Sequence, residues 1–376
     1  MLRRNWLSRV VWILCLSGLI APLDAAHASG GGEITRVRGE VWLTPAKKDK
    51  RRARVGDAVA PGARLSSGPS GRAFVEFGDG SELRLRPDTS ILLSGKAREE
   101  RKKTSVLLFF GRVWSKVARA VGGDEPSYEV GTANAVCGVR GTEFETAVAD
   151  DGAIRVTVTE GKVGVADAES QKLTTAGESV EGDEQGLDDP EPTPENQDYE
   201  AWRKQRRARL RQQGKQILAR IKRKIMSRKD KLEALRQRQK KVETLRAEAE
   251  AKAREGDKAA LDDLREYNRQ LAELADAIAD IGNQAEAQFG LVDHFADLAG
   301  DPRFKMVDRK TIAAEAENLR AVKKNLDAMV AAGTDISLAA MEKLIDEMRK
   351  GGETLRDDKG SAADELFGND EPFDMP

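Results

Sequence analysis

The chain has 376 residues, of which 63 are basic and 64 acidic, so its formal net charge is −1. Two cysteines and two histidines are too few for a disulfide framework, or for a zinc site that draws several ligands from these residue types. The charge is balanced only over the whole chain, because acidic and basic residues are segregated along it.

Residues 1–28 have the pattern of a secretory signal peptide. Arginines at positions 3 and 4 precede an apolar run over 10–21, and the Ala-His-Ala sequence at 26–28 suits cleavage after Ala28. This run is shorter than the ~20 residues that span a bilayer comfortably, although an uncleaved N-terminal anchor remains an alternative. Sec and twin-arginine export both stay open. We therefore expect an exported protein of the bacterial periplasm or cell envelope.

Cleavage would remove Cys15 and His27, leaving Cys137 and His294 as the remaining cysteine and histidine. An intramolecular disulfide is then excluded. A Cys/His nucleophile pair would require these two residues to meet across two differently composed halves of the chain. No phosphate-binding loop, nucleophile elbow or metal motif is present. We expect no catalytic residues, no metal and no cofactor, and hence a protein that is not an enzyme.

Residues 29–182 predict an all-β domain, because glycine and valine are frequent and apolar residues alternate with polar ones in short runs. The alternation over 73–77 and 83–85, with Gly-Asp-Gly-Ser between, predicts a hairpin with one buried face. A glycine, a charged residue and a valine recur at 39–41, 111–113 and 161–163, which predicts a turn followed by the start of a strand at each position. This recurrence indicates short strands in a layered or solenoid-like arrangement.

The stretch AVCGVRGTEFETAV at 135–148 places Cys137 and Arg140 beside two glycines. Arg140 could supply positive charge to a thiolate, but no general base lies nearby in the sequence. We interpret Cys137 as a small buried residue, and the glycine pair as a tight turn that opens a strand.

Several blocks in this region together resemble the FecR family of extracytoplasmic domains. VRGTEF at 139–144 is followed by VTEGKV at 158–163 and TAGE at 175–178, and two upstream blocks lie at 77–85 and 108–113. The signature positions, which we take as structural, are Gly138, Arg140, Gly141, Thr142, Glu143, Phe144, Glu160, Gly161 and Val163.

The resemblance implies a β-rich periplasmic domain that senses a ligand or binds a protein and has no catalytic residues. In its best-known context this domain belongs to an anti-sigma regulator that relays the state of an outer-membrane iron-siderophore receptor. The present chain has a signal peptide where that regulator has a cytoplasmic sigma-binding domain and a membrane span. Direct control of a sigma factor therefore does not follow from the resemblance.

The acidic, proline-containing segment 183–198 is expected to be an extended, solvated linker. Apolar residues then recur at three- and four-residue steps, which predicts an α-helical coiled-coil region over 199–350. Glu255-Gly256-Asp257 suggests an antiparallel hairpin, with one continuous helix as the alternative. Further helices are expected over 308–331 and 337–350, and an acidic disordered tail over 351–376.

The segment 203–241 is dense in lysine and arginine, with Asp230 and Glu233 as its only acids. Such a helix could bind an anionic lipid, lipopolysaccharide or a cell-wall polymer, and nucleic acid is not an expected partner of an exported protein. The candidate residues are Arg206, Arg207, Lys222 and Arg223. The alternative is a solvated charged face, paired with the acids at 181–200 or with an acidic second helix.

These observations predict an α+β multidomain protein, in which an all-β FecR-like domain precedes an elongated α-helical coiled-coil region. We expect a non-catalytic envelope protein whose β domain binds an unidentified protein or ligand for sensing or scaffolding. The helical region would act as a spacer or form a homo-oligomer. The alternative function is attachment to an anionic lipid, lipopolysaccharide or cell-wall surface through the basic helix.

Overall fold

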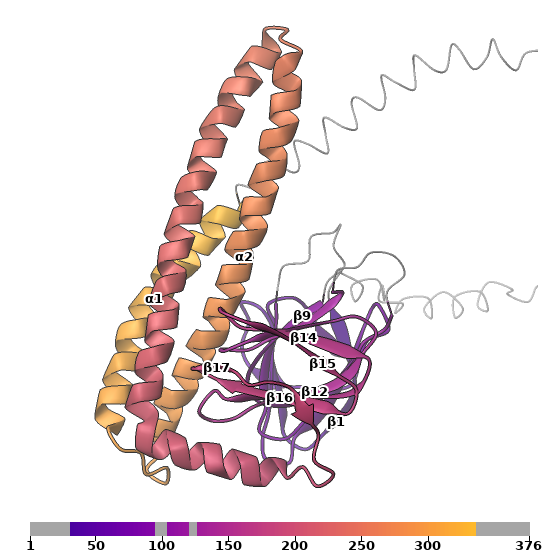
Figure 1. The fold of residues 1–376 in the computed structure, drawn as a ribbon, viewed down its shortest axis with the longest axis vertical. Coiled ribbons are helices and arrows are strands. Elements are labelled where there is room, and N and C mark those ends of the chain that lie inside the picture. The colour runs from indigo at the N-terminus through magenta and orange to yellow at the C-terminus, as the bar shows by residue number, and fades with distance from the viewer. Residues whose placement is uncertain (1–30, 95–103, 120–125, 336–376) are drawn as a thin grey trace, which may run out of the picture. The chain divides into compact units, whose positions relative to one another are not determined.

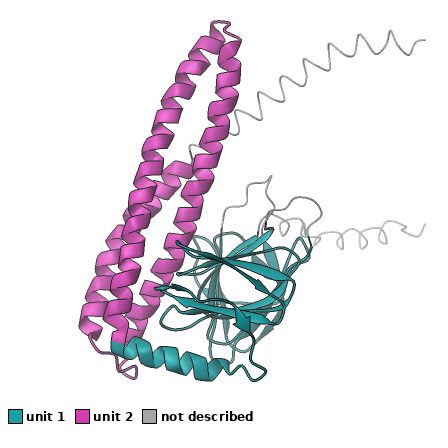
Figure 2. Ribbon diagram, in the orientation of Figure 1, with its two compact units in different colours: residues 1–212 teal, residues 213–376 magenta. Residues whose placement is uncertain are grey.

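The computed structural model describes residues 31–94, 104–119 and 126–335, drawn as a ribbon in Figure 1. The chain divides into two compact units, residues 1–212 and 213–376, which Figure 2 shows in teal and magenta. The predicted α+β class is confirmed, because the described part of the first unit is mainly strands and that of the second unit is helices. The expected signal peptide, the helix over 337–350 and the tail lie outside the described residues.

The first unit holds short strands and one long one, β9. Their bounds are β1 Gly32–Arg38, β2 Val41–Thr44, β3 Arg51–Arg52, β4 Ala58–Val59, β5 Arg64–Ser67, β6 Arg72–Phe77, β7 Glu82–Leu85, β8 Ser90–Leu93, β9 Thr104–Lys116, β10 Tyr128–Gly131, β11 Val136–Val139, β12 Glu143–Val148, β13 Ile154–Glu160, β14 Lys162–Ala166, β15 Gln171–Thr175, β16 Glu178–Asp183, β17 Gly186–Leu187 and β18 Glu191–Pro192.

The strands form two sheets that share β9. Sheet A has the order β4-β1-β6-β7-β9-β12-β13-β16, and β17 and β18 pair with the far side of β16. Sheet B has the order β3-β2-β5-β8-β9-β10-β11-β14-β15. Only the pairing of β9 with β10 is parallel among the described strands. The layered arrangement is therefore two sheets joined through one long strand.

The core lies between the inward faces of these sheets. Strand β6 alternates buried and exposed side chains, as the sequence predicted, and pairs with β7 in the expected hairpin. Tyr128 is fully buried, with its ring edge-on to Phe77 at 5.9 Å and to Phe144 at 6.4 Å. Its hydroxyl lies 3.2 Å from the Ser115 hydroxyl, which satisfies the polar end of an otherwise apolar residue.

The recurring glycine, charged residue and valine mark points where the chain passes from one sheet to the other. Gly39 lies between β1 of sheet A and β2 of sheet B, and Gly161 lies between β13 and β14 in the same way. Gly111 lies within β9, where this strand leaves sheet B and enters sheet A. All three have φ between +68° and +95°, a conformation that glycine adopts readily and other residues rarely do. The pattern thus encodes sheet crossings.

Residues 183–198 differ from the solvated linker that the sequence predicted. Strands β17 and β18 within this segment pair with β16, and the Glu184 side chain is fully buried. The acidic composition misled the prediction at the start of this segment, because arginines of the following helix pair with the carboxylates of Asp183 and Glu184. The first compact unit accordingly continues to residue 212 and includes the start of that helix.

Helix α1 (Tyr199–Arg254) and helix α2 (Ala259–Gly300) are joined by a short turn, and a third helix covers residues 309–335. The predicted break at 255–257 is confirmed. Gly256 has a φ of +95° after the end of α1, and a carboxylate oxygen of Asp257 accepts a hydrogen bond from the backbone N–H of Ala259 at 2.9 Å. The third helix matches the one that the sequence predicted over 308–331.

The described part of the second unit is a bundle of three helices. Arg246 contacts Asn268 and Arg228 contacts Gln284, so the α1 segment from residue 213 and α2 run antiparallel. The third helix runs parallel to this α1 segment, because Lys222 pairs with Glu315 and, farther along both helices, Gln239 donates a hydrogen bond to the carbonyl of Gly333 at 2.7 Å. Most apolar residues that recur at helical steps along α1 and α2 are buried: Leu218, Ile221, Ile225, Leu232, Val242, Leu264, Leu271, Leu274 and Ile278. Leu235, Tyr267 and Ile281 belong to the same pattern and are half-buried. The polar side chain of Gln239 is also buried.

Candidate functional site

The signature segment 138–144 forms the crossing from β11 of sheet B to β12 of sheet A. Gly141 has a φ of +63°, and a Cβ there would lie 3.2 Å from the Cβ of Arg119. Phe144 then enters the core, while half-buried Arg140 and Glu143 flank the turn. The arrangement makes this segment a structural corner, and it brings no pair of reactive groups together.

A second corner stacks against the first. Gly161 has a φ of +83°, and a Cβ there would lie 2.9 Å from the hydroxyl oxygen of Thr142. That hydroxyl donates a hydrogen bond to the carbonyl of Lys162 at 3.0 Å. Glu160 and Glu143 are cross-strand partners, and Val163 is fully buried. Two signature blocks that are about 20 residues apart in the chain therefore form one local structure.

Cys137 lies on β11 with its side chain in the core. It is fully buried, and this burial raises the pKa of its thiol to about 12. A thiol that stays protonated at neutral pH is a poor nucleophile. Cys137 thus packs as a small apolar residue.

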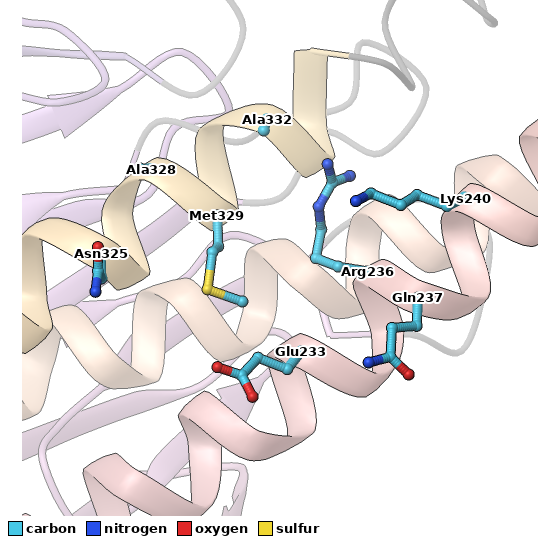
Figure 3. A pocket seen from close by; sticks show the side chains of 8 residues that line it. All are labelled: Glu233, Arg236, Gln237, Lys240, Asn325, Ala328, Met329 and Ala332. Atoms are coloured by element: carbon cyan, nitrogen blue, oxygen red, sulfur yellow. The ribbon is translucent and has the colours of Figure 1, made fainter.

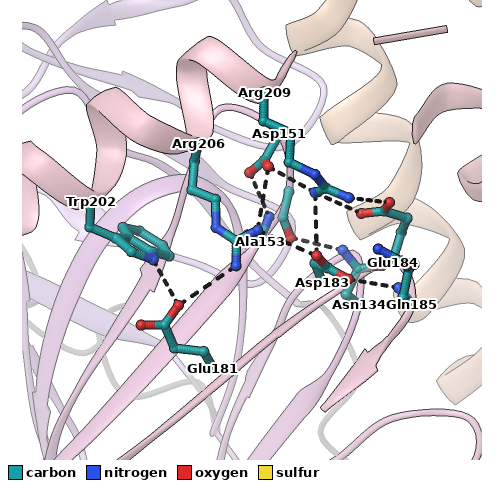
Figure 4. Close-up of polar contacts among 11 residues, drawn as sticks. Asn134, Asp151, Ala153, Glu181, Asp183, Glu184, Gln185, Trp202, Arg206 and Arg209 are labelled. Carbon is teal, nitrogen blue, oxygen red and sulfur yellow. Dashed lines mark hydrogen bonds and ion pairs between the residues drawn. The ribbon is translucent and has the colours of Figure 1, made fainter. Parts of the chain in front are cut away.

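The predicted polyanion-binding residues fall in different units, and most are paired with carboxylates. Arg206 contacts Asp183 at 3.3 Å and Glu181 at 3.6 Å, as Figure 4 shows. Arg207 reaches the buried carboxylate of Asp150, with its Nε 3.1 Å from an oxygen. In the second unit Lys222 pairs with Glu315 of the third helix, whereas Arg223 is exposed.

Arg209 holds two buried carboxylates and was not among the predicted residues. It contacts Asp151 at 3.0 Å and Glu184 at 2.6 Å, and both of these side chains are fully buried (Figure 4). Burial raises the pKa of Asp151, against the opposing effect of Arg206 and Arg209. The indole N–H of Trp202 donates to Glu181 at 2.9 Å. The start of α1 is therefore fastened to the β domain by ion pairs that leave these arginines little capacity for an outside anion.

Sequence reasoning also missed an array of arginines and aromatic rings on the outward face of sheet A. Cross-strand pairing places Arg36 beside Phe74, Phe74 beside Arg84, and Arg84 beside Trp114. The guanidinium carbon of Arg84 lies 3.7 Å from the centre of the Trp114 ring, and that of Arg36 lies 4.6 Å from Phe74. Such cation–π stacks hold both partners in fixed orientations. The sequence does contain one sign of this array: Arg72 and Phe74 are two residues apart in a strand whose other face is apolar, so both must point outward.

A second row of arginines adjoins this one. Arg38 and Arg72 are cross-strand partners, and the backbone N–H of Arg86 donates to the carbonyl of Arg112. Burial lowers the pKa of Arg86, and the neighbouring Arg112, Arg72 and Arg84 act in the same direction against the attraction of Glu145. The face therefore concentrates positive charge.

A groove in the second unit lies between α1 and the third helix and encloses about 540 Å³ (Figure 3). Its lining residues are Glu233, Arg236, Gln237, Lys240, Asn325, Ala328, Met329 and Ala332. Glu233 is already paired with Lys229, and Arg236 contacts Gln239. The groove thus has mixed charge and presents no converging set of catalytic groups.

The described residues contain no group of three or more His, Cys, Asp or Glu side chains placed to hold a metal ion. Among the helices of residues 31–335, none combines the length and the apolar character that crossing a membrane requires.

The two sheets, the stacked crossings and the packed core together define one β domain. Residues 63–164 match the model of the FecR protein family, so the chain carries a FecR domain. No curated protein matches the sequence.

Solved structures resemble parts of the chain. Two crystal structures from Parabacteroides distasonis, each described provisionally as an anti-sigma factor, are 24% and 22% identical, with TM-scores of 0.28 and 0.31. The matches cover 31% and 37% of this chain and 53% and 63% of those chains, less than two thirds of their length. A third structure, called a cell surface anchoring domain, is 25% identical with a TM-score of 0.17, over 17% of this chain and 86% of its own.

Proposed function

We propose that this chain is a non-catalytic sensing or scaffold protein of the bacterial envelope, in which the FecR domain binds a partner protein. The observation that carries the proposal is the FecR domain itself. Its core is filled by apolar side chains, and the buried thiol of Cys137 is not suited to act as a nucleophile. The signature residues of the FecR domain set the backbone conformation at the corners, and side chains on the outer surface of the domain are available to contact a partner protein.

The helical unit would act as a spacer or an oligomerisation element. In support, the bundle is closed by contacts among its own helices, and the Gln239 amide is used within it. A buried polar group of this kind specifies helix register at some cost in stability. An exported location follows from the expected signal peptide at 1–28, which lies outside the described residues.

Attachment through the basic helix is the less supported function. Arg206, Arg207 and Lys222 each have a carboxylate partner, so binding an external anion would require these ion pairs to be exchanged. Removing one partner from a partly buried ion pair lowers the free energy of unfolding, because the other charge stays buried without a counter-ion. Salt-sensitive binding of the full chain to phosphatidylglycerol vesicles, abolished by charge reversal at the exposed Arg223, would favour this function instead.

The test of the partner-binding function is chemical crosslinking of the full chain in its native cells, with two variants that damage one unit each. Phe144→Asp places a charge in the β core, and Leu271→Asp places one in the helical bundle. We expect Phe144→Asp to abolish a discrete protein adduct and Leu271→Asp to retain it. An adduct that survives Phe144→Asp would contradict the proposal.

A further inference from the structure

The outward face of sheet A carries three parallel cross-strand rows of different character. One row pairs Arg38 with Arg72 and continues towards Arg86, which directly follows the end of β7, and the next row is Arg36, Phe74, Arg84 and Trp114. The third row is acidic, because Glu33 pairs with Glu76 and Glu76 pairs with Glu82. We call the first two rows the arginine face.

Positive charge on the arginine face exceeds what nearby carboxylates neutralise. Arg84 contacts Glu82 at 3.3 Å and Arg86 contacts Glu145 at 3.7 Å, but Glu145 is shared with Arg112. In the described part of the chain, Arg36, Arg38 and Arg72 form no ion pair with a carboxylate, and all three side chains are exposed. The face therefore retains unneutralised cations.

This arrangement lowers the stability of the domain. Like charges directly opposite each other on neighbouring strands are destabilising, and Arg38 faces Arg72 in that way. The Nε groups of Arg84 and Arg86 are buried and have no hydrogen-bond acceptor among the described residues. A cost to folding of this kind is typical of residues retained for binding.

One guanidinium group of the face, that of Arg84, which also donates a hydrogen bond to Glu82, is held in a fixed orientation. Arg84 lies against Trp114 at 3.7 Å and against Phe74 at 5.3 Å, so two rings restrict its side chain. A planar guanidinium that is stacked on one side presents a fork of donors suited to a carboxylate. Arginine and tryptophan are also the residues that most often dominate protein–protein binding energy.

We propose that the arginine face docks an acidic segment of a partner protein, and this inference rests on the partner-binding function proposed above. The adjoining acidic row favours a narrow ligand. A broad anionic surface such as a membrane would bring its charges against Glu33, Glu76 and Glu82, whereas an extended peptide can follow the two arginine-bearing rows alone. The two arginine-bearing rows would thus attract the acidic side chains of the peptide, and the adjoining acidic row would repel anionic groups that extend beyond them.

The test uses the full chain and a fluorescein-labelled peptide of alternating glutamate and leucine, with binding followed by fluorescence anisotropy. The decisive variant is Arg38→Glu with Arg72→Glu, because both side chains are exposed and their loss leaves the core intact. The matched control is Lys47→Glu with Lys48→Glu, which makes the same change in net charge in an exposed turn after β2. Trp114→Ala tests the aromatic platform separately.

We expect Arg38→Glu with Arg72→Glu to weaken peptide binding by about tenfold or more, Trp114→Ala to weaken it, and the lysine control to leave it within about twofold of wild type. Equal loss in the lysine control, or unchanged binding in the arginine variant, would overturn the inference. So would tighter binding of a single-stranded DNA or of phosphatidylglycerol vesicles than of the peptide. Such results leave the crosslinking test with Phe144→Asp unaffected, so failure of this docking face is distinguishable from failure of the proposed function.

Discussion

The hydroxyl oxygen of Thr142 occupies the space into which a side chain at Gly161 would extend, at 2.9 Å from where its Cβ would lie. The carbonyl of Gly141 lies 3.0 Å from the same point. Two corners of the sheet crossing are therefore packed against each other without room for one additional methyl group. This contact explains in physical terms why a glycine is needed at the second corner.

Gly161→Ala should destabilise the first unit by more than Gly177→Ala. Both glycines have nearly equal φ, +83° and +84°, so both variants incur a backbone cost of about 1–2 kcal/mol. Only Gly161 has atoms close to the added methyl group, whereas nothing lies within 4 Å at Gly177. We expect an additional loss of about 1–3 kcal/mol for Gly161→Ala.

The measurement is urea unfolding followed by tryptophan fluorescence. Trp42, Trp114 and Trp202 all lie in the first unit, and Trp6 and Trp12 belong to the expected signal peptide, so this signal reports the first unit in the cleaved chain. Equal destabilisation by the two alanine variants would show that the corner contact has no energetic role.

The sequence predicted much of the local structure, because local structure depends on neighbouring residues. Alternation over 73–85 predicted the hairpin of β6 and β7, and Gly256 marked the end of α1. The recurring glycines were recognised as turns. That each turn carries the chain between two sheets depends on the pairing of distant strands, which no local pattern reveals.

The site was harder to predict for the same reason. The acidic composition around Asp183 and Glu184 predicted a solvent-exposed segment, but Arg209, 25 residues beyond Glu184, binds the carboxylate of Glu184. The arginine face depends on strand register, because Arg84 meets Trp114 only when β7 pairs with β9. Residue types along one strand could indicate the outward positions but not the rows that they form.

Arg209→Met should strongly destabilise the first unit. It would leave the buried carboxylates of Asp151 and Glu184 without their main cation, at a cost of about 3–5 kcal/mol. Lys204→Met is the matched control, because Lys204 is exposed on the same helix. Tryptophan-detected urea unfolding compares the two variants, and a loss under about 1 kcal/mol for Arg209→Met would argue against a role in fastening the helix.

Cys137 should make the first unit less stable at high pH. Burial raises the pKa of its thiol to about 12, so the folded state keeps a proton that the unfolded state releases near pH 9. The resulting stability is fully present below that pH and is lost as the pH rises towards 12. The free energy of unfolding of wild type, relative to Cys137→Ala, should therefore fall by up to about 1.4 kcal/mol per pH unit in this range. A difference that stays constant with pH would show that the thiol is not buried.

Arg228→Met should stabilise the helical bundle. Burial lowers the pKa of Arg228 to about 10, and in the described residues its partner is the amide oxygen of Gln284 rather than a carboxylate. Replacing such a buried charge with an apolar side chain of similar length should raise the free energy of unfolding by about 1–2 kcal/mol. Circular dichroism at the helix band follows this transition, with Arg223→Met as the exposed control. Destabilisation by Arg228→Met would indicate that the cation is satisfied in the native bundle.

The most direct test of the account is a photo-crosslinking amino acid placed at one surface position of the full chain in its native cells. Benzoylphenylalanine at Phe74 puts the probe on the arginine face, and the same residue at Leu261, which is 48% exposed, puts it on the helical unit. We expect a discrete adduct with an acidic partner protein at Phe74, lost with Arg38→Glu and Arg72→Glu, and no such adduct at Leu261. A protein adduct that forms at Leu261 and not at Phe74 would contradict this expectation.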